Sequence, residues 1–165
     1  MSVSHILTTL SKLERLHRSL LDLSMKKTDI IKENNMAKLD ETLKNEQAHV
    51  AAIERLEQQR LVEVTDYLRA QGCAPTEAPT VSQLIEVAQG EEQEQLRAVR
   101  ERLTTIIAEL KQRNDLNQKM IFQSLQFVNI TLDLLQPRPE QMNYGNTANG
   151  RVAQPMKKSY FESQA

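Results

Sequence analysis

The sequence predicts an all-α protein: a long antiparallel helical hairpin, similar to a coiled coil, with a short intervening helix and a disordered C-terminal tail. The chain of 165 residues contains only four Gly, five Pro and 4% aromatic residues. Its abundance of Leu, Glu, Gln and Lys is typical of long helices. Apolar residues recur in alternating steps of about three and four, the spacing of one helical stripe. We therefore expect one helical domain, residues 1–136, and a flexible tail, residues 137–165.

The segment from Val3 to about Ala70 contains no Gly or Pro, and we interpret it as one long helix. Unbroken, it would be roughly 100 Å long, because an α-helix rises 1.5 Å per residue. Asn34 and Asn35 form its weakest point because Asn has a low helix propensity. A bend or interruption would cost least there.

A short helix is predicted after this first segment. Gly72 occupies the position just past a helix end, where the left-handed conformation favours glycine, and the prolines that follow prevent the helix from resuming. Thr80 and Gln83 form a capping-box signature that begins the short helix. We expect Gly90 to close it.

The last helix is predicted from about Glu91 to Leu135, where prolines stop it, and its second half carries two apolar faces. The first face comprises Asn117, Ile121, Leu125, Val128, Leu132 and Leu135. The second face comprises Leu116, Met120, Phe127, Ile130 and Leu134, with Gln123 in its one gap. At 100° per residue, the two faces lie well over a quarter turn apart. The first face can close the hairpin, so the second face needs another partner.

We expect the last helix to pair antiparallel with the first, back to about residue 25. The Leu-rich segment Ile6–Leu23 would then extend beyond the pair, or fold back and cover the second face. Asn114 and Asn117 fall at seam positions, where a polar side chain fixes helix register at some cost in stability. We therefore expect a structural role for both residues rather than direct ligand binding.

Composition narrows the classes of function. Lys and Arg number 21 against 22 Asp and Glu, giving a net charge of −1, so no basic excess favours nucleic acid or anionic lipid. No segment has the apolar length for membrane insertion, and the Met1 end lacks a signal-peptide pattern. Because Cys73 is the single cysteine, no internal disulfide framework is possible. We expect a reduced, soluble, cytoplasmic protein.

No arrangement of residues predicts catalysis. His5, His17 and His49 are far apart, and none pairs with a carboxylate at metal-ligand spacing. There is no phosphate-binding glycine loop, nucleophile elbow or dinucleotide fingerprint. We expect no enzymatic activity, no catalytic residue, no metal and no cofactor.

The second face therefore carries the functional hypothesis, with three alternatives left open. It could pack within the chain, form a homodimer, or bind a partner helix through anchors at helical spacing. A generic coiled-coil scaffold or adaptor is one alternative function. Its seam should run through many regular heptads, and this one becomes irregular between Ser24 and Val50. The chain would be a monomer or weak dimer.

Three features in chain order resemble the FlgN flagellar export chaperones. They are LEQQR at Leu56–Arg60, the Asn114 and Asn117 pair leading into an apolar helix, and Tyr144-Gly145 in the tail. The resemblance spans nearly the whole chain, including the closing residues 161–165. The spacing from Gly145 to Gly150 differs from the family's usual Tyr-Gly-x-x-Gly.

The resemblance implies a cytoplasmic chaperone of type III flagellar export. Such proteins bind the C-terminal helical segments of hook–filament junction proteins, prevent their premature assembly, and deliver them to the export gate and its ATPase complex. It implies client binding on the C-terminal helix, at the second face, and export-gate docking through Tyr144 and Gly145. A type III secretion chaperone for another client is the alternative nearest to this one.

Overall fold

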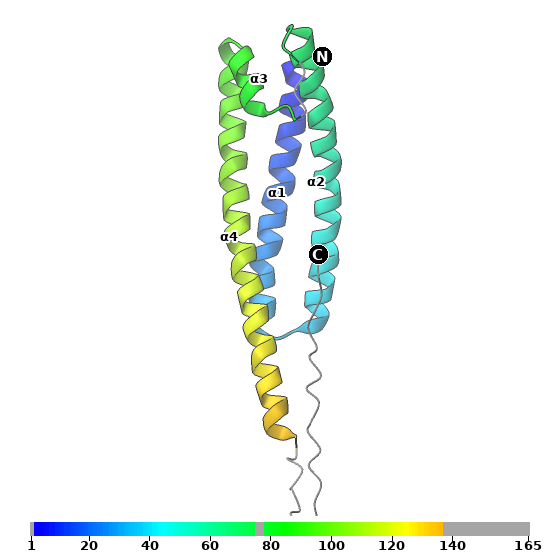
Figure 1. The fold of residues 1–165 in the computed structure, drawn as a ribbon, viewed down its shortest axis with the longest axis vertical. Coiled ribbons are helices and arrows are strands. Elements are labelled where there is room, and N and C mark those ends of the chain that lie inside the picture. Colours follow the sequence, from blue (N-terminus) through cyan, green and yellow to red (C-terminus); the bar gives the residue numbers. More distant parts are fainter. Residues whose placement is uncertain (1, 75–77, 137–165) are drawn as a thin grey trace, which may run out of the picture.

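The computed structural model describes residues 2–74 and 78–136, and all regular structure within them is helical. The four helices are α1 (Val3–Lys32), α2 (Met36–Ala70), α3 (Val81–Val87) and α4 (Gly90–Leu135). Figure 1 shows three long helices side by side, with α3 at one end of them. The predicted all-α class, with long packed helices and a short intervening one, is confirmed. The predicted tail, 137–165, lies outside the described residues.

The segment Val3–Ala70 is two helices rather than one, and the break falls at the predicted weakest point, because the chain reverses at Asn34 and Asn35. Asn34 adopts the left-handed conformation with φ of 55°, which Asn tolerates better than most residues. The N–H groups of Asn34 and Asn35 bond the carbonyls of Ile31 and Ile30, at 3.1 and 3.3 Å, the pattern of a Schellman helix end. Asn35 Oδ1 then accepts from the Lys38 N–H at 3.1 Å and caps α2. Two adjacent asparagines thus end one helix and start the next.

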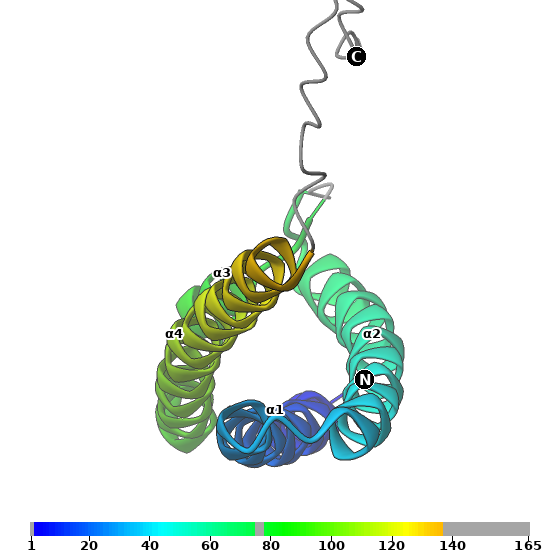
Figure 2. The ribbon, with the colours of Figure 1, turned by 90° about the horizontal axis from the view of Figure 1, so that it is seen from below.

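The antiparallel hairpin is formed by α1 and α2, and α1 lies between α2 and α4 (Figure 2). The expected antiparallel pairing of the last helix with the first is wrong. Three hydrogen-bonded pairs join α1 to α4: Glu14 to Arg102, Ser24 to Asn114 and Thr28 to Asn117, which are 88, 90 and 89 residues apart. A constant offset means that the two helices run parallel. The segment Ile6–Leu23 therefore packs against the first half of α4 and does not cover the second face.

The main hydrophobic core lies at the end of the molecule that carries α3. It joins residues from all four helices: Val3, Ile6, Leu10, Leu13, Val64, Leu68, Leu84, Ile85, Ala88, Leu96 and Val99. A smaller cluster of Leu20, Leu21, Ile106 and Leu110 continues between α1 and α4. The core therefore thins toward the opposite end, where α1 turns into α2.

The local signals around α3 are confirmed with one exception. Gly72 has φ of 77° just past the end of α2. Thr80 and Gln83 form the predicted capping box, with the Thr80 N–H donating to Gln83 Oε1 at 3.0 Å and the Gln83 N–H donating to Thr80 Oγ1 at 3.3 Å. Gly90, expected to close the short helix, instead stands at the first position of α4.

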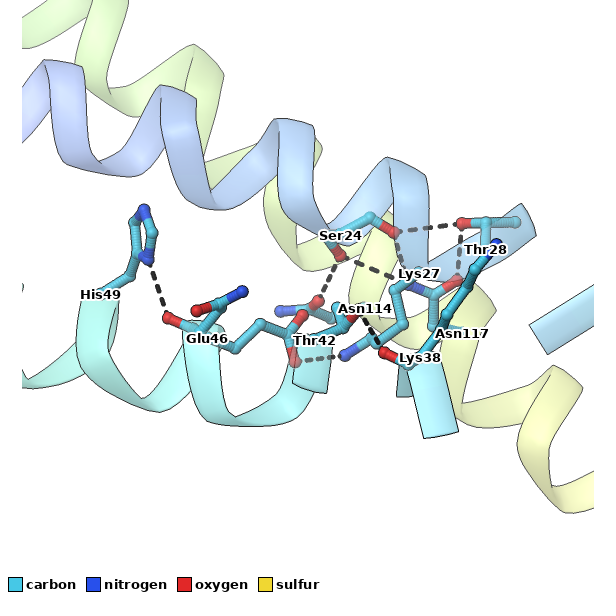
Figure 3. A network of polar contacts seen from close by, with 10 residues as sticks. Ser24, Lys27, Thr28, Lys38, Thr42, Glu46, His49, Asn114 and Asn117 are labelled. Carbon is cyan, nitrogen blue, oxygen red and sulfur yellow. Dashed lines mark hydrogen bonds and ion pairs between the residues drawn. The ribbon is translucent and has the colours of Figure 1, made fainter. Parts of the chain in front are cut away.

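A polar layer separates the core from the α1–α2 turn (Figure 3). Thr28 Oγ1 donates to Asn117 Oδ1 at 2.7 Å, and Asn117 Nδ2 donates to the Ser24 carbonyl at 2.8 Å. Ser24 Oγ also donates to Asn114 Oδ1 at 2.8 Å. Asn117 is 1% exposed, so the predicted seam position of the two asparagines is confirmed. Such a layer permits one register, because a shift of α4 along α1 would leave these groups unpaired.

The register makes α4 longer than the rest of the bundle. With an offset of 89 residues, the end of α1 at Lys32 lies level with Ile121. The remainder of α4, Phe122–Leu135, continues for about 20 Å past the level at which α1 ends (Figure 1). Among the described residues, only the α1–α2 turn and the start of α2 approach its first turns. We call Phe122–Leu135 the projecting segment.

Candidate partner-binding surface

The second face is open to solvent over most of its length. Leu116 is 42% exposed, Phe127 71% and Leu134 80%. Ile130 and Gln123 are exposed as well, and Met120 is half-buried. None of the four helices therefore seals this face. The function of Leu116, Met120, Gln123, Phe127, Ile130 and Leu134 in partner binding stays a prediction.

The first face of α4 packs against another helix, as predicted, only as far as Ile121. Asn117 is buried against α1 and Ile121 is half-buried. Leu125, Val128, Leu132 and Leu135 are exposed, so the expectation that the whole first face closes a hairpin is wrong. The physical reason is length: α1 ends at Lys32, and beyond that level the described part of the chain approaches α4 only with the α1–α2 turn and the start of α2.

One residue of the exposed apolar surface of α4 was not predicted from the sequence periodicity. Phe122 belongs to neither predicted face, and its side chain is 61% exposed. Its position is apolar on a third side of α4, so the projecting segment presents apolar side chains almost all around. The chain contains only three Phe, and two of them, Phe122 and Phe127, lie in adjacent turns of this helix. This clustering was the sequence signal that could have identified Phe122.

The distal part of α4 exposes a large apolar surface. Nine large apolar side chains between Leu116 and Leu135 are each more than two-fifths exposed. At on the order of 100 Å² each, they present about 900 Å² in total, spread over several sides of the helix. A single patch on a typical monomer is about 300–600 Å², so this total is large for so short a segment. Lys119 and Asp133 are the only charged residues in this stretch, so a partner would be held by apolar contact rather than by charge.

A groove forms where the second face meets the α1–α2 turn. It has a volume of about 420 Å³. Its walls combine second-face residues with the end of α1 and the turn: Ile31, Lys32, Asn34, Met120, Gln123, Ser124, Phe127 and Val128. The structure thus brings Met120, Gln123 and Phe127 together with turn residues that the single-helix prediction could not have placed there.

Other candidate chemistry is weak in the described part of the chain. His17 Nδ1 lies 2.8 Å from the Leu13 carbonyl and is satisfied within its own helix. Among residues 2–74 and 78–136, no cluster of three or more His, Cys, Asp or Glu could hold a metal ion. None of the described helices combines the length and apolarity needed to cross a membrane.

Tyr144 and Gly145, predicted to dock at the export gate, lie outside the described residues. Their function stays a prediction.

Comparisons with known proteins agree with the resemblance noted in the sequence. The family model described as FlgN protein matches residues 1–151. The chain is also 30% identical to the uncharacterized protein YvyG of Bacillus subtilis (strain 168), over 165 residues and the full length of both proteins. The comparison with solved structures gave no match. With the family model covering most of its length, the chain belongs to the FlgN family of flagellar export chaperones.

Proposed function

We propose that this protein is a cytoplasmic export chaperone for hook–filament junction proteins. It binds their C-terminal helical segments on the second face, keeps them from assembling early, and delivers them to the export gate. Family membership supports the general chaperone function. The identity of the client and the delivery step are the parts that we propose.

The observation that carries the proposal is the projecting segment. A helix that extends about four turns past the end of α1 and exposes Phe127, Ile130 and Leu134 leaves most of its apolar surface in contact with water. An amphipathic client helix on these residues would bury apolar surface on both sides. The client surface masked in this way is the kind that self-assembles. Met120 adds adaptability, since an unbranched thioether side chain fits more than one client.

The experiment replaces Phe127 with Asp and measures affinity for the hook–filament junction protein of the same genome. Because Phe127 is largely exposed, we expect helix content by circular dichroism to be unchanged. Loss of a central aromatic anchor should weaken client binding roughly a hundredfold or more. Val62→Asp is the matched control, because Val62 is 57% exposed on α2, far along the chain from the second face.

Two results would contradict the proposal. Unchanged binding by Phe127→Asp would remove the second face from client recognition. An equal loss of helix content and of binding would show that Phe127 belongs to the fold.

Export-gate docking is proposed for Tyr144 and Gly145 in the tail. If docking and client binding are separate, a chain ending at Leu135 should bind the client with unchanged affinity and fail to associate with export-gate components. Weakened client binding by the shortened chain would argue against this division of function.

A further inference from the structure

The short helix α3 occupies a position between α2 and α4. It contacts both helices, whereas no Cα atoms of α2 and α4 lie within 8 Å of each other in the described residues. Leu84 and Ile85 of α3 are buried in the main core. On the α4 side, Gln93 Nε2 donates to the Ile85 carbonyl at 2.7 Å, and on the α2 side, Arg60 donates to the Pro79 carbonyl at 3.3 Å. The space between α2 and α4 at this end of the molecule is therefore filled by a two-turn amphipathic helix, α3.

The surfaces that hold α3 continue along both long helices after α3 ends. Eighteen residues equal five helical turns, so residues 18 apart share one side of a helix. On α2, Val50 is 18 residues before Leu68, which is buried beside α3. On α4, Ile121 is 18 residues after Leu103, which packs on the same core. Val50 and Ile121 therefore extend the two sides that α3 covers.

These extended sides form what we call the inner groove. Around a cavity beside the α1–α2 turn, its α2 wall is Met36 and Leu39, and its α4 wall is Ile121, Leu125 and Val128. This cavity has a volume of about 150 Å³, with Ile30 and Ile31 of α1 at its base. Helical spacing places Leu43 and Val50 further along the same side of α2. Leu43 and Val50 are 41% and 45% exposed, so this part of the wall is open.

One mostly buried ion pair lies between α1 and α2 along the inner groove. Lys27 Nζ and Glu46 Oε2 lie 2.7 Å apart between α1 and α2, with both side chains mostly buried, and so they neutralise each other. A groove with apolar walls and a neutralised ion pair fits an amphipathic helix held by aliphatic anchors, as α3 is held by Leu84 and Ile85.

The inner groove and the second face lie on different sides of α4. Leu125 and Phe127 are two residues apart and so point about 160° away from each other on the helix. The two surfaces meet at the α1–α2 turn, where both cavities are lined by Ile31, Asn34, Ser124 and Val128. One straight client helix still cannot contact Leu125 and Phe127 together. The tail of this chain is a poor occupant, because residues 137–165 are rich in Pro, Gly, Asn and Ser and have no helical apolar period.

We propose that the inner groove binds a second amphipathic helix of the client, separate in sequence from the segment on the second face. The projecting segment of α4 then lies between two client helices, and the inner helix continues the position of α3. This inference rests on the proposed function and extends it, since it assigns α2 a share in client binding.

The test compares Val50→Asp with Val62→Asp, the same substitution on the same helix at comparable exposure. The probes are the full-length hook–filament junction protein of the same genome and its isolated C-terminal helical segment. We expect Val50→Asp to weaken binding of the full-length protein tenfold or more and to change binding of the isolated segment less than twofold. Val62→Asp should change neither. Thermal melts confirm folding, and Val50→Ser replaces Val50→Asp if the latter unfolds.

The outcomes separate this inference from the proposed function. Equal binding of the full-length client by the Val50 and Val62 variants, with binding lost in Phe127→Asp, would overturn the inner groove alone. No effect of Phe127→Asp on either probe would overturn the proposed function. A photo-crosslinking residue placed at Leu43 should label a client segment other than the one labelled from Phe127. Labelling of one shared segment, or of a second copy of this chain, would also overturn the inference.

Discussion

Replacing Asn117 with Ala tests the polar layer between α1 and α4. Asn117 is 1% exposed and makes two short hydrogen bonds to α1, to Thr28 Oγ1 at 2.7 Å and to the Ser24 carbonyl at 2.8 Å. Thr28 can fall back on the Ser24 carbonyl, 3.2 Å away. The Ser24 carbonyl then keeps the Thr28 hydroxyl as a donor, so the loss is that of the two hydrogen bonds made by the Asn117 amide.

The magnitude follows from these contacts. Two neutral hydrogen bonds contribute about 1 kcal/mol each, and the small cavity left by the amide adds to this loss. We expect Asn117→Ala to lower the free energy of unfolding by about 2–3 kcal/mol, which corresponds to a Tm decrease of roughly 6–12 °C. Arg102→Ala is the control. Its ion pair with Glu14 is 49% exposed on the arginine side, so it should cost less than about 0.5 kcal/mol.

The assay is urea unfolding followed by circular dichroism at 222 nm, with a second variant that separates stability from register. Asn117→Leu fills the site, and Ser24 Oγ keeps Asn114 as its acceptor. We expect the free energy of unfolding of Asn117→Leu to be within about 1 kcal/mol of that of the natural protein. We also expect α4 to pair with α1 in more than one register in this variant. Register is read by disulfide formation between cysteines placed at Glu14 and Arg102, with Cys73 replaced by Ser. An Asn117→Ala protein with an unchanged midpoint would refute this reasoning.

Two further predictions concern other contacts. Lys27→Met should lower the free energy of unfolding by about 3 kcal/mol, because Glu46 would keep a mostly buried charge without its partner. In urea unfolding, the double variant Lys27→Met/Glu46→Leu should recover most of that loss. A double variant as unstable as the single variant would contradict this explanation. Thr80→Ala should cost about 1 kcal/mol by removing the N-cap of α3. A stability equal to that of Ser82→Ala, the control two residues later, would argue against a contribution from the capping box.

The helix content and most helix starts and ends were predictable from the sequence, because they depend on residues close to one another in the chain. The capping box at Thr80 and the helix end at Gly72 each involve residues within five positions. The seam positions of Asn114 and Asn117 followed from the apolar period alone. These features need no knowledge of which helices pair.

The sequence located the weakest point of the predicted long helix at Asn34 and Asn35, but it did not show that the chain reverses there. Asparagine at a helix end is less diagnostic than glycine, and the flanking residues continue a helical pattern on both sides. The reversal changes which residues of the candidate surface are exposed. With one long helix, the last helix had to pair antiparallel with it, and the first face was assigned wholly to the hairpin. Because α1 stops at Lys32, Leu125 and Leu132 are exposed. The relative lengths of α1 and α4 determine which apolar side chains of α4 are exposed to solvent. The apolar period of the sequence carries no information about these lengths.

The parallel arrangement of α1 and α4 also bears on the order in which the chain can fold during synthesis. The α1–α2 hairpin involves contacts such as Lys27 with Glu46, 19 residues apart, and can form while the ribosome is still making α3. Docking of α4 requires contacts across about 89 residues, and contacts at such separation form late. We expect the nascent chain to present α1 with one side uncovered until α4 emerges. The projecting segment is the last part of α4 to be synthesised, and because α1 ends at Lys32 it does not depend on α1 for cover and stays free to meet a client.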